Sequence, residues 1–331
     1  MGKLSTMLSK ATFAGLCCLA ALPVAASAAY PEKTIKIVVP YPPGNASDTV
    51  GRVVAEQLSK RLGQAVVVDN RPGASGGIGA RAVAQSDPDG YTLLMTSTSF
   101  TINTALTANL LYDVERDFDG ISVLTSSGGM LLVVKPSLGV NTVEELVALL
   151  KQKPNQLNYG QAGRGTIQHL TMESFLAAVD AKAYEVAYKG SVQALTDIVG
   201  GNLDFMFDAR GSATPFAQDG RVKLLAVSSE RRLGALPELP TVQESGLPGL
   251  KQWSVAGWTG LLAPKGTPPA VIEKLNTEIK EILQSDAIQQ RLKSLHMESL
   301  PHKNPAQVQA FLREDMKRWQ DAATAAKLEK Q

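Results

Sequence analysis

Residues 34–48 read TIKIVVPYPPGNASD, and their pattern indicates the fold class. Its first six residues are mostly β-branched, which is typical of a buried strand. The Pro-rich turn at 40–44 ends that strand, and Ser47 or Asp48 is expected to cap a helix running to about Leu62. A second apolar strand follows at 65–68. The stretch therefore begins a strand–helix–strand unit with parallel strands.

The same alternation continues along the chain. It predicts further strands at 91–95, 130–134, 157–159, 185–188, 203–207, 222–227 and 253–262. The intervening segments carry helix-start signals, and charged amphipathic helices follow at 269–283 and 305–325. We expect an α/β fold of two lobes, each a mainly parallel sheet flanked by helices. Residues 129–254 would form the second lobe, inserted into a first lobe made of 30–128 and 255–331.

The N-terminus has the pattern of a secretory signal. Lys3 and Lys10 precede an apolar run at 11–24 that ends in small residues at 25–29. A membrane anchor is the alternative, but the run is short for a span and contains Pro23. We expect cleavage after Ala28 or Ala29 and export to the periplasm. Cys17 and Cys18 are the only cysteines of the chain, so the mature protein would have no disulfide and no reactive thiol.

Charge excludes some classes of partner. The formal net charge of +2 includes the two lysines of the signal, so the mature chain would be formally neutral. No basic field favours nucleic acid or an anionic membrane surface. No apolar run after Val24 is long enough to span a bilayer. We expect a soluble monomer.

The glycine-rich stretch at 73–79, GASGGIG, resembles a dinucleotide-binding turn and makes an NAD-dependent enzyme the rival class. Three observations disfavour it. The stretch follows the second strand rather than the first, Pro72 interrupts the approach from that strand to the glycines, and no Tyr is followed four residues later by Lys. We expect no cofactor.

The same geometry suits a carboxylate. Glycines at a helix start expose backbone N–H groups, and the helix dipole adds positive potential there. Three such turns lie at 41–48, 73–79 and 160–166. Their candidate ligand-binding residues include Gly44, Ser75, Arg164 and Gly165. Each turn could equally be no more than a tight connection, and that alternative stays open.

Hydrolytic chemistry finds no support in the sequence. The three histidines are His169, His296 and His302, and neither the H-x-x-x-H nor the G-x-S-x-G spacing occurs, so neither a metal site nor a serine hydrolase is predicted. Asp48 could act as a base, but its position equally suits capping or bracing of the loop. Asp208 follows an apolar strand directly, where doubly wound sheets place their ligands, and is a site candidate.

Several blocks of sequence carry a family resemblance when taken in order. They are Pro42-Pro43-Gly44 with Asp48, Asn70-Arg71-Pro72-Gly73-Ala74, Asp89-Gly90-Tyr91-Thr92, Tyr159-Gly160 through His169-Leu170, Tyr188-Lys189-Gly190, Phe207-Asp208 and Leu239-Pro240-Thr241-Val242. Over essentially the whole mature chain, the sequence resembles the Bug-type solute receptors, the binding components of tripartite tricarboxylate transporters.

The resemblance implies a periplasmic receptor of type II, or Venus-flytrap, architecture that is not an enzyme. Such a receptor closes on a small carboxylate and serves the membrane subunits of its transporter. By position, the resemblance implies ligand-binding roles for Tyr41, Asn45, Ala46, Asp48, Thr98, Thr166 and Asp208. An enzyme or a sensory partner built on the same scaffold is the alternative.

The sequence departs from the family pattern in two places. Asn45 stands where a second glycine is usual; it could add a donor at the carboxylate turn or occupy a left-handed conformation. Gln161, Ala162 and Arg164 vary the second-lobe turn, where Arg164 could pair with a distal carboxylate or point to solvent. Di- and tricarboxylates, acidic amino acids and aromatic acids all remain candidate ligands.

Overall fold

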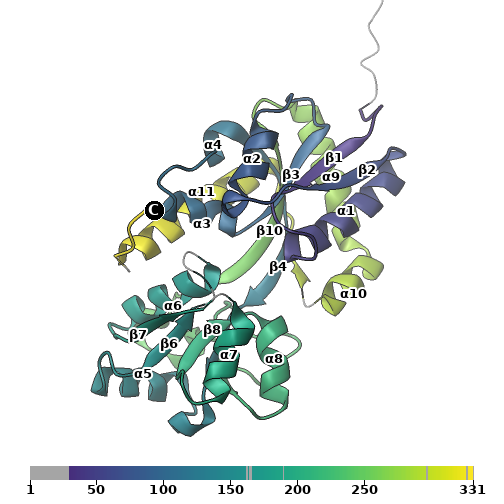
Figure 1. Cartoon of the computed structure of the whole chain (residues 1–331). Coiled ribbons are helices and arrows are strands. Elements are labelled where there is room, and N and C mark those ends of the chain that lie inside the picture. Colours follow the sequence, from purple (N-terminus) through teal and green to yellow (C-terminus); the bar gives the residue numbers. More distant parts are fainter. Residues whose placement is uncertain are drawn as a thin grey trace, which may run out of the picture.

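A computed structural model of the chain describes residues 30–161, 163, 166–188, 190–295, 297–325 and 327–330. The predicted signal at 1–29 and the candidates Arg164 and Gly165 lie outside the described residues. Figure 1 shows two lobes, one above the other, with β4 and β10 running from the upper lobe toward the lower.

The first lobe is built on a six-stranded sheet of order β11-β4-β10-β3-β1-β2. Its strands are β1 (Ile35–Val39), β2 (Val66–Asn70), β3 (Thr92–Ser97), β4 (Phe118–Gly129), β10 (Ala256–Pro264) and β11 (Glu298–Ser299). Its helices are α1 (Ala46–Leu62), α2 (Gly77–Ala84), α3 (Ser99–Leu106), α4 (Val114–Asp117), α9 (Pro269–Gln284), α10 (Asp286–Ser294) and α11 (Pro305–Ala325).

The second lobe is built on a five-stranded sheet of order β7-β6-β8-β5-β9. Its strands are β5 (Leu131–Val134), β6 (Asn158–Gln161), β7 (Tyr184–Ala187), β8 (Phe205–Asp208) and β9 (Lys223–Val227). Its helices are α5 (Val143–Gln152), α6 (Ile167–Ala178), α7 (Ser191–Val199) and α8 (Arg210–Gln218).

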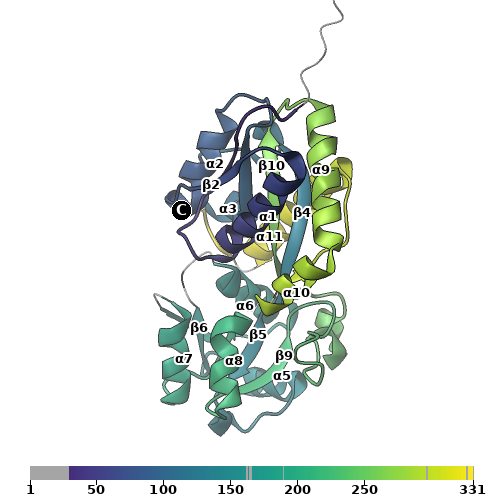
Figure 2. The ribbon, with the colours of Figure 1, turned by 90° about the vertical axis from the view of Figure 1, so that its right-hand side faces the viewer.

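Both sheets are covered by helices on two faces. Successive side chains of a strand point to opposite faces, and these strands carry apolar side chains on both. Ile35 and Ile37 of β1 enter a core with α1, α9 and α10, whereas Val38 enters a second core with α2 and α11. Figure 2 shows this sheet lying between α2 and α3 on one side and α9 on the other. In the second lobe, α5 and α6 cover one face, and α7 and α8 cover the other.

The sheets are more mixed than the alternation of strands and helices predicts. Parallel pairing joins β1 to β2 and β3, and β6 to β7 and β8. In contrast, β10 pairs antiparallel with β3 and β4, and β5 pairs antiparallel with β8 and β9. The antiparallel pairs arise where the chain passes between the lobes.

The lobes are joined at two adjacent crossings. β4 ends at Gly129 in one sheet and β5 begins at Leu131 in the other, while the return follows β9 through 228–255 into β10. Ser228 is fully buried between the two crossings. Its Oγ accepts from the Met130 N–H (2.7 Å) and donates to the Val255 carbonyl (2.5 Å). One side chain therefore links both connections.

Several elements differ from the sequence-based prediction. The last long strand begins at Ala256 rather than 253, and β4, α3, α8 and α10 were not predicted. None of the helices among the described residues is both long and apolar enough to cross a membrane.

Candidate functional site: a cavity between the lobes

The loop that follows β1 is organised by the start of α1. Asn45 is the N-cap of that helix, and its Oδ1 accepts from the Asp48 N–H at 2.8 Å. The expected cap at Ser47 or Asp48 is therefore wrong. Asn45 has extended backbone angles (φ −76°, ψ 172°) rather than the left-handed conformation considered from the sequence. An extended backbone with a side-chain acceptor is the usual geometry of a helix N-cap.

Asp48 braces this loop. Its carboxylate accepts from the Gly44 N–H (2.8 Å), from Asn70 Nδ2 (2.9 Å) and from the guanidinium of Arg52 (2.9 and 3.1 Å). Burial raises the pKa of the Asp48 carboxyl, but the hydrogen bonds from Arg52, Gly44 and Asn70 outweigh it and hold that pKa below its usual value. Gly44 has φ +86°, a conformation that glycine adopts without strain. The loop-bracing role of Asp48 thus accounts for its contacts without a role as a base.

Tyr41 and Thr98 bring the ends of β1 and β3 together. The Tyr41 hydroxyl lies 3.3 Å from Thr96 Oγ1 and 3.2 Å from Ser97 Oγ. Burial raises the pKa of the Tyr41 phenol, so it stays protonated and can donate. Thr98 is buried at the start of α3, and its Oγ1 accepts from the Trp258 N–H at 2.8 Å.

A cavity of about 140 Å³ lies between the lobes, beside the end of β3 and the start of α3. Ala46 and Thr98 line it, as predicted from the sequence, and Ile167 at the start of α6 lines it from the second lobe. The hydroxyl-bearing residues that sequence reasoning missed are Ser97, Ser99, Thr125 and Thr259, and the apolar ones are Met130, Trp258 and Met297. Gly257 completes the lining.

The chemistry of the cavity wall is neutral and rich in hydroxyl groups. Thr125 Oγ1 and Thr259 Oγ1 hydrogen-bond to each other at 2.7 Å. No Lys, Arg, Asp or Glu is among the described residues that line the cavity. An anion here would be held by hydroxyl and backbone N–H donors, which bind carboxylate oxygens directionally.

The second-lobe candidates Thr166 and Asp208 hold the starts of helices in place. Thr166 caps α6; its Oγ1 donates to the Gly163 carbonyl (2.7 Å) and accepts from the His169 N–H (3.4 Å). Asp208 is fully buried and accepts from the hydroxyls of Ser191 and Ser212, both at 2.5 Å. Burial raises the pKa of the Asp208 carboxyl even though these hydroxyls favour its charged form.

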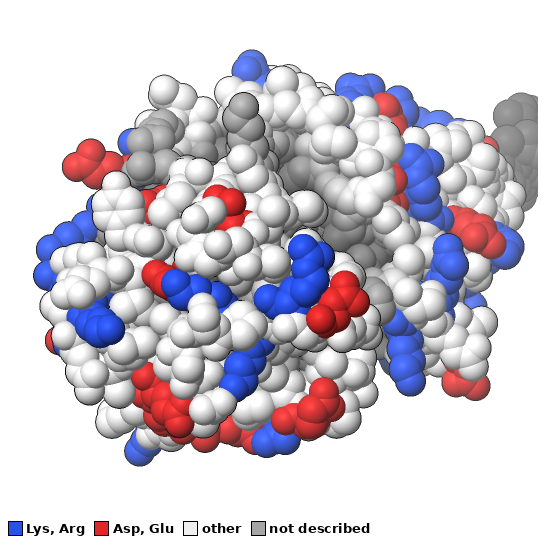
Figure 3. Space-filling model, turned by 60° about the horizontal axis from the view of Figure 1, so that its bottom comes forward, with Lys and Arg blue, Asp and Glu red and all other residues white. Residues whose placement is uncertain are grey.

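Asp208 therefore ties the first turns of α7 and α8 to the end of β8 and does not itself line the cavity. Ser75 is exposed, has a left-handed backbone (φ 53°) and accepts through its carbonyl from Asn103 Nδ2. It too lies off the cavity wall. Figure 3 shows positive and negative side chains interspersed on the face it displays, with no field of one sign.

Two α/β lobes joined by paired crossings, with a small cavity of hydroxyl and apolar side chains between them, are the architecture of a solute-binding protein. A sequence profile of the tripartite tricarboxylate transporter family receptor matches residues 50–328. The chain belongs to this family, which consists of solute-binding receptors and not enzymes.

Solved structures show the same relationship. The R. palustris protein Rpa4515 with adipate is 31% identical, with a TM-score of 0.75 over 91% of this chain and 100% of that one. The periplasmic binding protein BugD is 33% identical, with a TM-score of 0.72 over 91% of this chain and 100% of that one. MatC from Rhodopseudomonas palustris with bound malate is 29% identical, with a TM-score of 0.70 over 88% of this chain and 99% of that one. The predicted Bug-type family and two-lobe α/β class are confirmed.

Proposed function

We propose that this protein is a periplasmic receptor that captures a small dicarboxylate in the interlobe cavity and delivers it to the membrane subunits of a tripartite tricarboxylate-type transporter. The observation that carries the proposal is the cavity itself, lined by hydroxyl groups of the first lobe and covered by Ile167 of the second. Similar proteins with adipate and with malate support a dicarboxylate as the ligand.

Within this proposal, Ala46 and Thr98 form the wall against which one carboxylate lies. The Tyr41 hydroxyl sits behind Ser97 and orients it. Gly44, Asn45 and Asp48 hold the loop in shape. Thr166 fixes the start of α6, where Ile167 lines the cavity, and Asp208 fixes the starts of α7 and α8. The proposed lobes are residues 30–128 with 255–331, and residues 129–254.

Ala46 offers a direct test because its side chain is exposed at the start of α1 and also lines the cavity. Ala46→Leu should fill part of the cavity without disturbing the core. Calorimetric titration with adipate and malate should show one site in the native protein and at least a tenfold loss of affinity in Ala46→Leu. Ala270→Leu, an equally exposed alanine in the first turn of α9, is the matched control and should bind normally. Equal binding by both variants would place the ligand elsewhere.

We also propose that the N-terminal segment is removed on export by cleavage after Ala28 or Ala29. The charged start, the apolar run and the small residues before Tyr30 support this. N-terminal sequencing of the protein purified from its host should begin at Ala29 or Tyr30. An intact Met1 on the periplasmic protein would contradict cleavage.

A further inference from the structure

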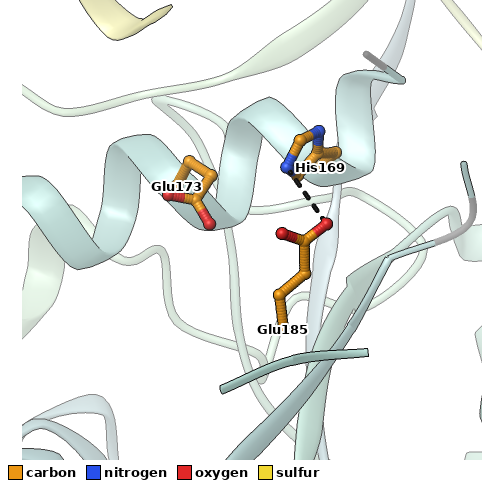
Figure 4. Close-up of side chains that lie close together, drawn as sticks. All are labelled: His169, Glu173 and Glu185. Atoms are coloured by element: carbon orange, nitrogen blue, oxygen red, sulfur yellow. Dashed lines mark ion pairs between the residues drawn. The ribbon is translucent and has the colours of Figure 1, made fainter. Parts of the chain in front are cut away.

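Three potential metal ligands meet in the second lobe, between α6 and the edge strand β7. His169 and Glu173 lie one turn apart on α6, and Glu185 reaches toward them from the neighbouring edge strand β7 (Figure 4). One ligand atom from each residue lies within 4.8 Å of those of the other two. None of the three lines the interlobe cavity. We propose that His169, Glu173 and Glu185 form a zinc-binding site.

The spacing suits a tetrahedral ion. His169 is 1% exposed, and its Nε2 lies 3.6 Å from Glu185 Oε1, which is too far for a hydrogen bond. Two ligand atoms bound to one zinc at bond lengths of about 2.0–2.2 Å stand roughly 3.4 Å apart in tetrahedral geometry. An ion between these two atoms would therefore need little movement of either side chain. Glu173, four residues after His169, lies on the same face of the helix and supplies the third ligand.

Each carboxylate is already oriented by a second residue. The Tyr159 hydroxyl donates to Glu173 Oε1, and Gln161 Nε2 donates to Glu185 Oε1 at 3.0 Å. Tyr159 and Gln161 are both buried on β6, so both carboxylates are held by side chains of this strand. No hydrogen bond from a described residue reaches Oε2 of either carboxylate. Hydrogen bonds of this kind, made to the metal ligands themselves, are a regular part of zinc sites.

The charge balance also favours a divalent cation. Neither Glu173 nor Glu185 forms an ion pair with a Lys or Arg in the part of the chain that the structure describes. One zinc ion would neutralise both carboxylates. The imidazole ligand favours zinc over magnesium or calcium, which prefer all-oxygen sites.

The test uses the untagged mature protein, freed of metal with a chelator, and ZnCl₂ as the probe. Calorimetry should show one zinc bound per chain, with no competition from millimolar Mg²⁺ or Ca²⁺. Glu185→Gln changes an exposed strand position, so the fold should persist, and zinc affinity should fall at least tenfold. Glu144→Gln, an exposed glutamate of α5 in the same lobe, is the matched control and should bind zinc normally.

His169→Gln should lose zinc as well, whereas His302→Gln, an exposed histidine of the first lobe, should keep it. Anomalous scattering at the zinc edge should place the ion between His169 and Glu185. Native protein without stoichiometric zinc binding, or undiminished binding by Glu185→Gln, would overturn the site. Ala46→Leu should still bind zinc, so the zinc result is independent of the carboxylate proposal.

Discussion

The carboxyl groups of Asp48 and Asp208, one in each lobe, have pKa values shifted in opposite directions. Both are buried beside helix starts. Asp48 has the guanidinium of Arg52 as a partner, and the pKa of its carboxyl is lowered; Asp208 has neutral hydroxyl partners, and burial raises the pKa of its carboxyl. The presence of a cationic partner decides whether the pKa of the buried carboxyl is lowered or raised. Sequence reasoning identified both carboxylates, but it could not identify their partners, which come from separate elements.

Asp48 should make stability depend on pH in a defined direction. Because its folded-state pKa lies below the usual 3.8, its stabilising contribution is present above that value and is lost as the pH falls through the folded-state pKa. Asp48→Asn should lower the free energy of unfolding by roughly 1–3 kcal/mol at pH 7. Urea unfolding should show this difference shrinking toward pH 3. Asp219→Asn, an exposed aspartate after α8, serves as the control. A difference that does not change with pH would contradict the assignment.

Thr98 couples the fold to the proposed ligand site. Thr98→Val removes the acceptor of the Trp258 N–H and leaves that buried group unpaired, which should cost about 1–3 kcal/mol of stability. It should also weaken carboxylate binding, because a hydroxyl of the cavity wall is lost. Thr98→Ser keeps the hydroxyl and should restore both properties. Thermal unfolding and calorimetry measure the two effects; if Thr98→Ser and Thr98→Val bind alike, the hydroxyl does not contact the ligand.

At the scale of elements, the sequence predicts best where local pattern and tertiary structure agree. The strand before Pro40 and the helix to Leu62 were found because β-branched residues and helix periodicity mark them clearly. β4 was missed because its sequence, FDGISVLTSSGG, is rich in glycine and serine. It forms a strand because β10 pairs along nearly its whole length. The cavity residue Met297 and the zinc ligand Glu185 were missed because no local pattern joins them to residues far away in the sequence.

Gly129 at the crossing from β4 to β5 should tolerate no side chain. A Cβ there would overlap the Ser229 backbone nitrogen and lie 2.8 Å from Ser228 Oγ. Gly129→Ala should therefore lower the free energy of unfolding by about 1–3 kcal/mol through overpacking. Gly211→Ala is the control, because a Cβ at this exposed helical position meets nothing within 4 Å. That change should be neutral or slightly stabilising. Equal unfolding midpoints in denaturant would show that the crossing is not tightly packed.

At the scale of the whole molecule, the lobes also touch away from the crossings. Leu170 of α6 packs with Ile102 of α3 and Trp319 of α11 in one apolar cluster. Asp315 of α11 anchors that helix, since its Oδ2 accepts from Thr101, Trp258 and Trp319. The C-terminal helix thus joins the wall of the cavity to the second lobe. A hinge motion would act on this apolar contact and on the Ser228 link, while each sheet stays intact.

We propose that the two lobes close on a small carboxylate. Small-angle X-ray scattering of the mature protein, with and without a saturating dicarboxylate identified by calorimetry, tests it most directly. We predict a smaller radius of gyration with ligand, because ligand favours the closed arrangement, and no change in Ala46→Leu. A ligand that binds with one-to-one stoichiometry and leaves the radius of gyration unchanged would contradict closure.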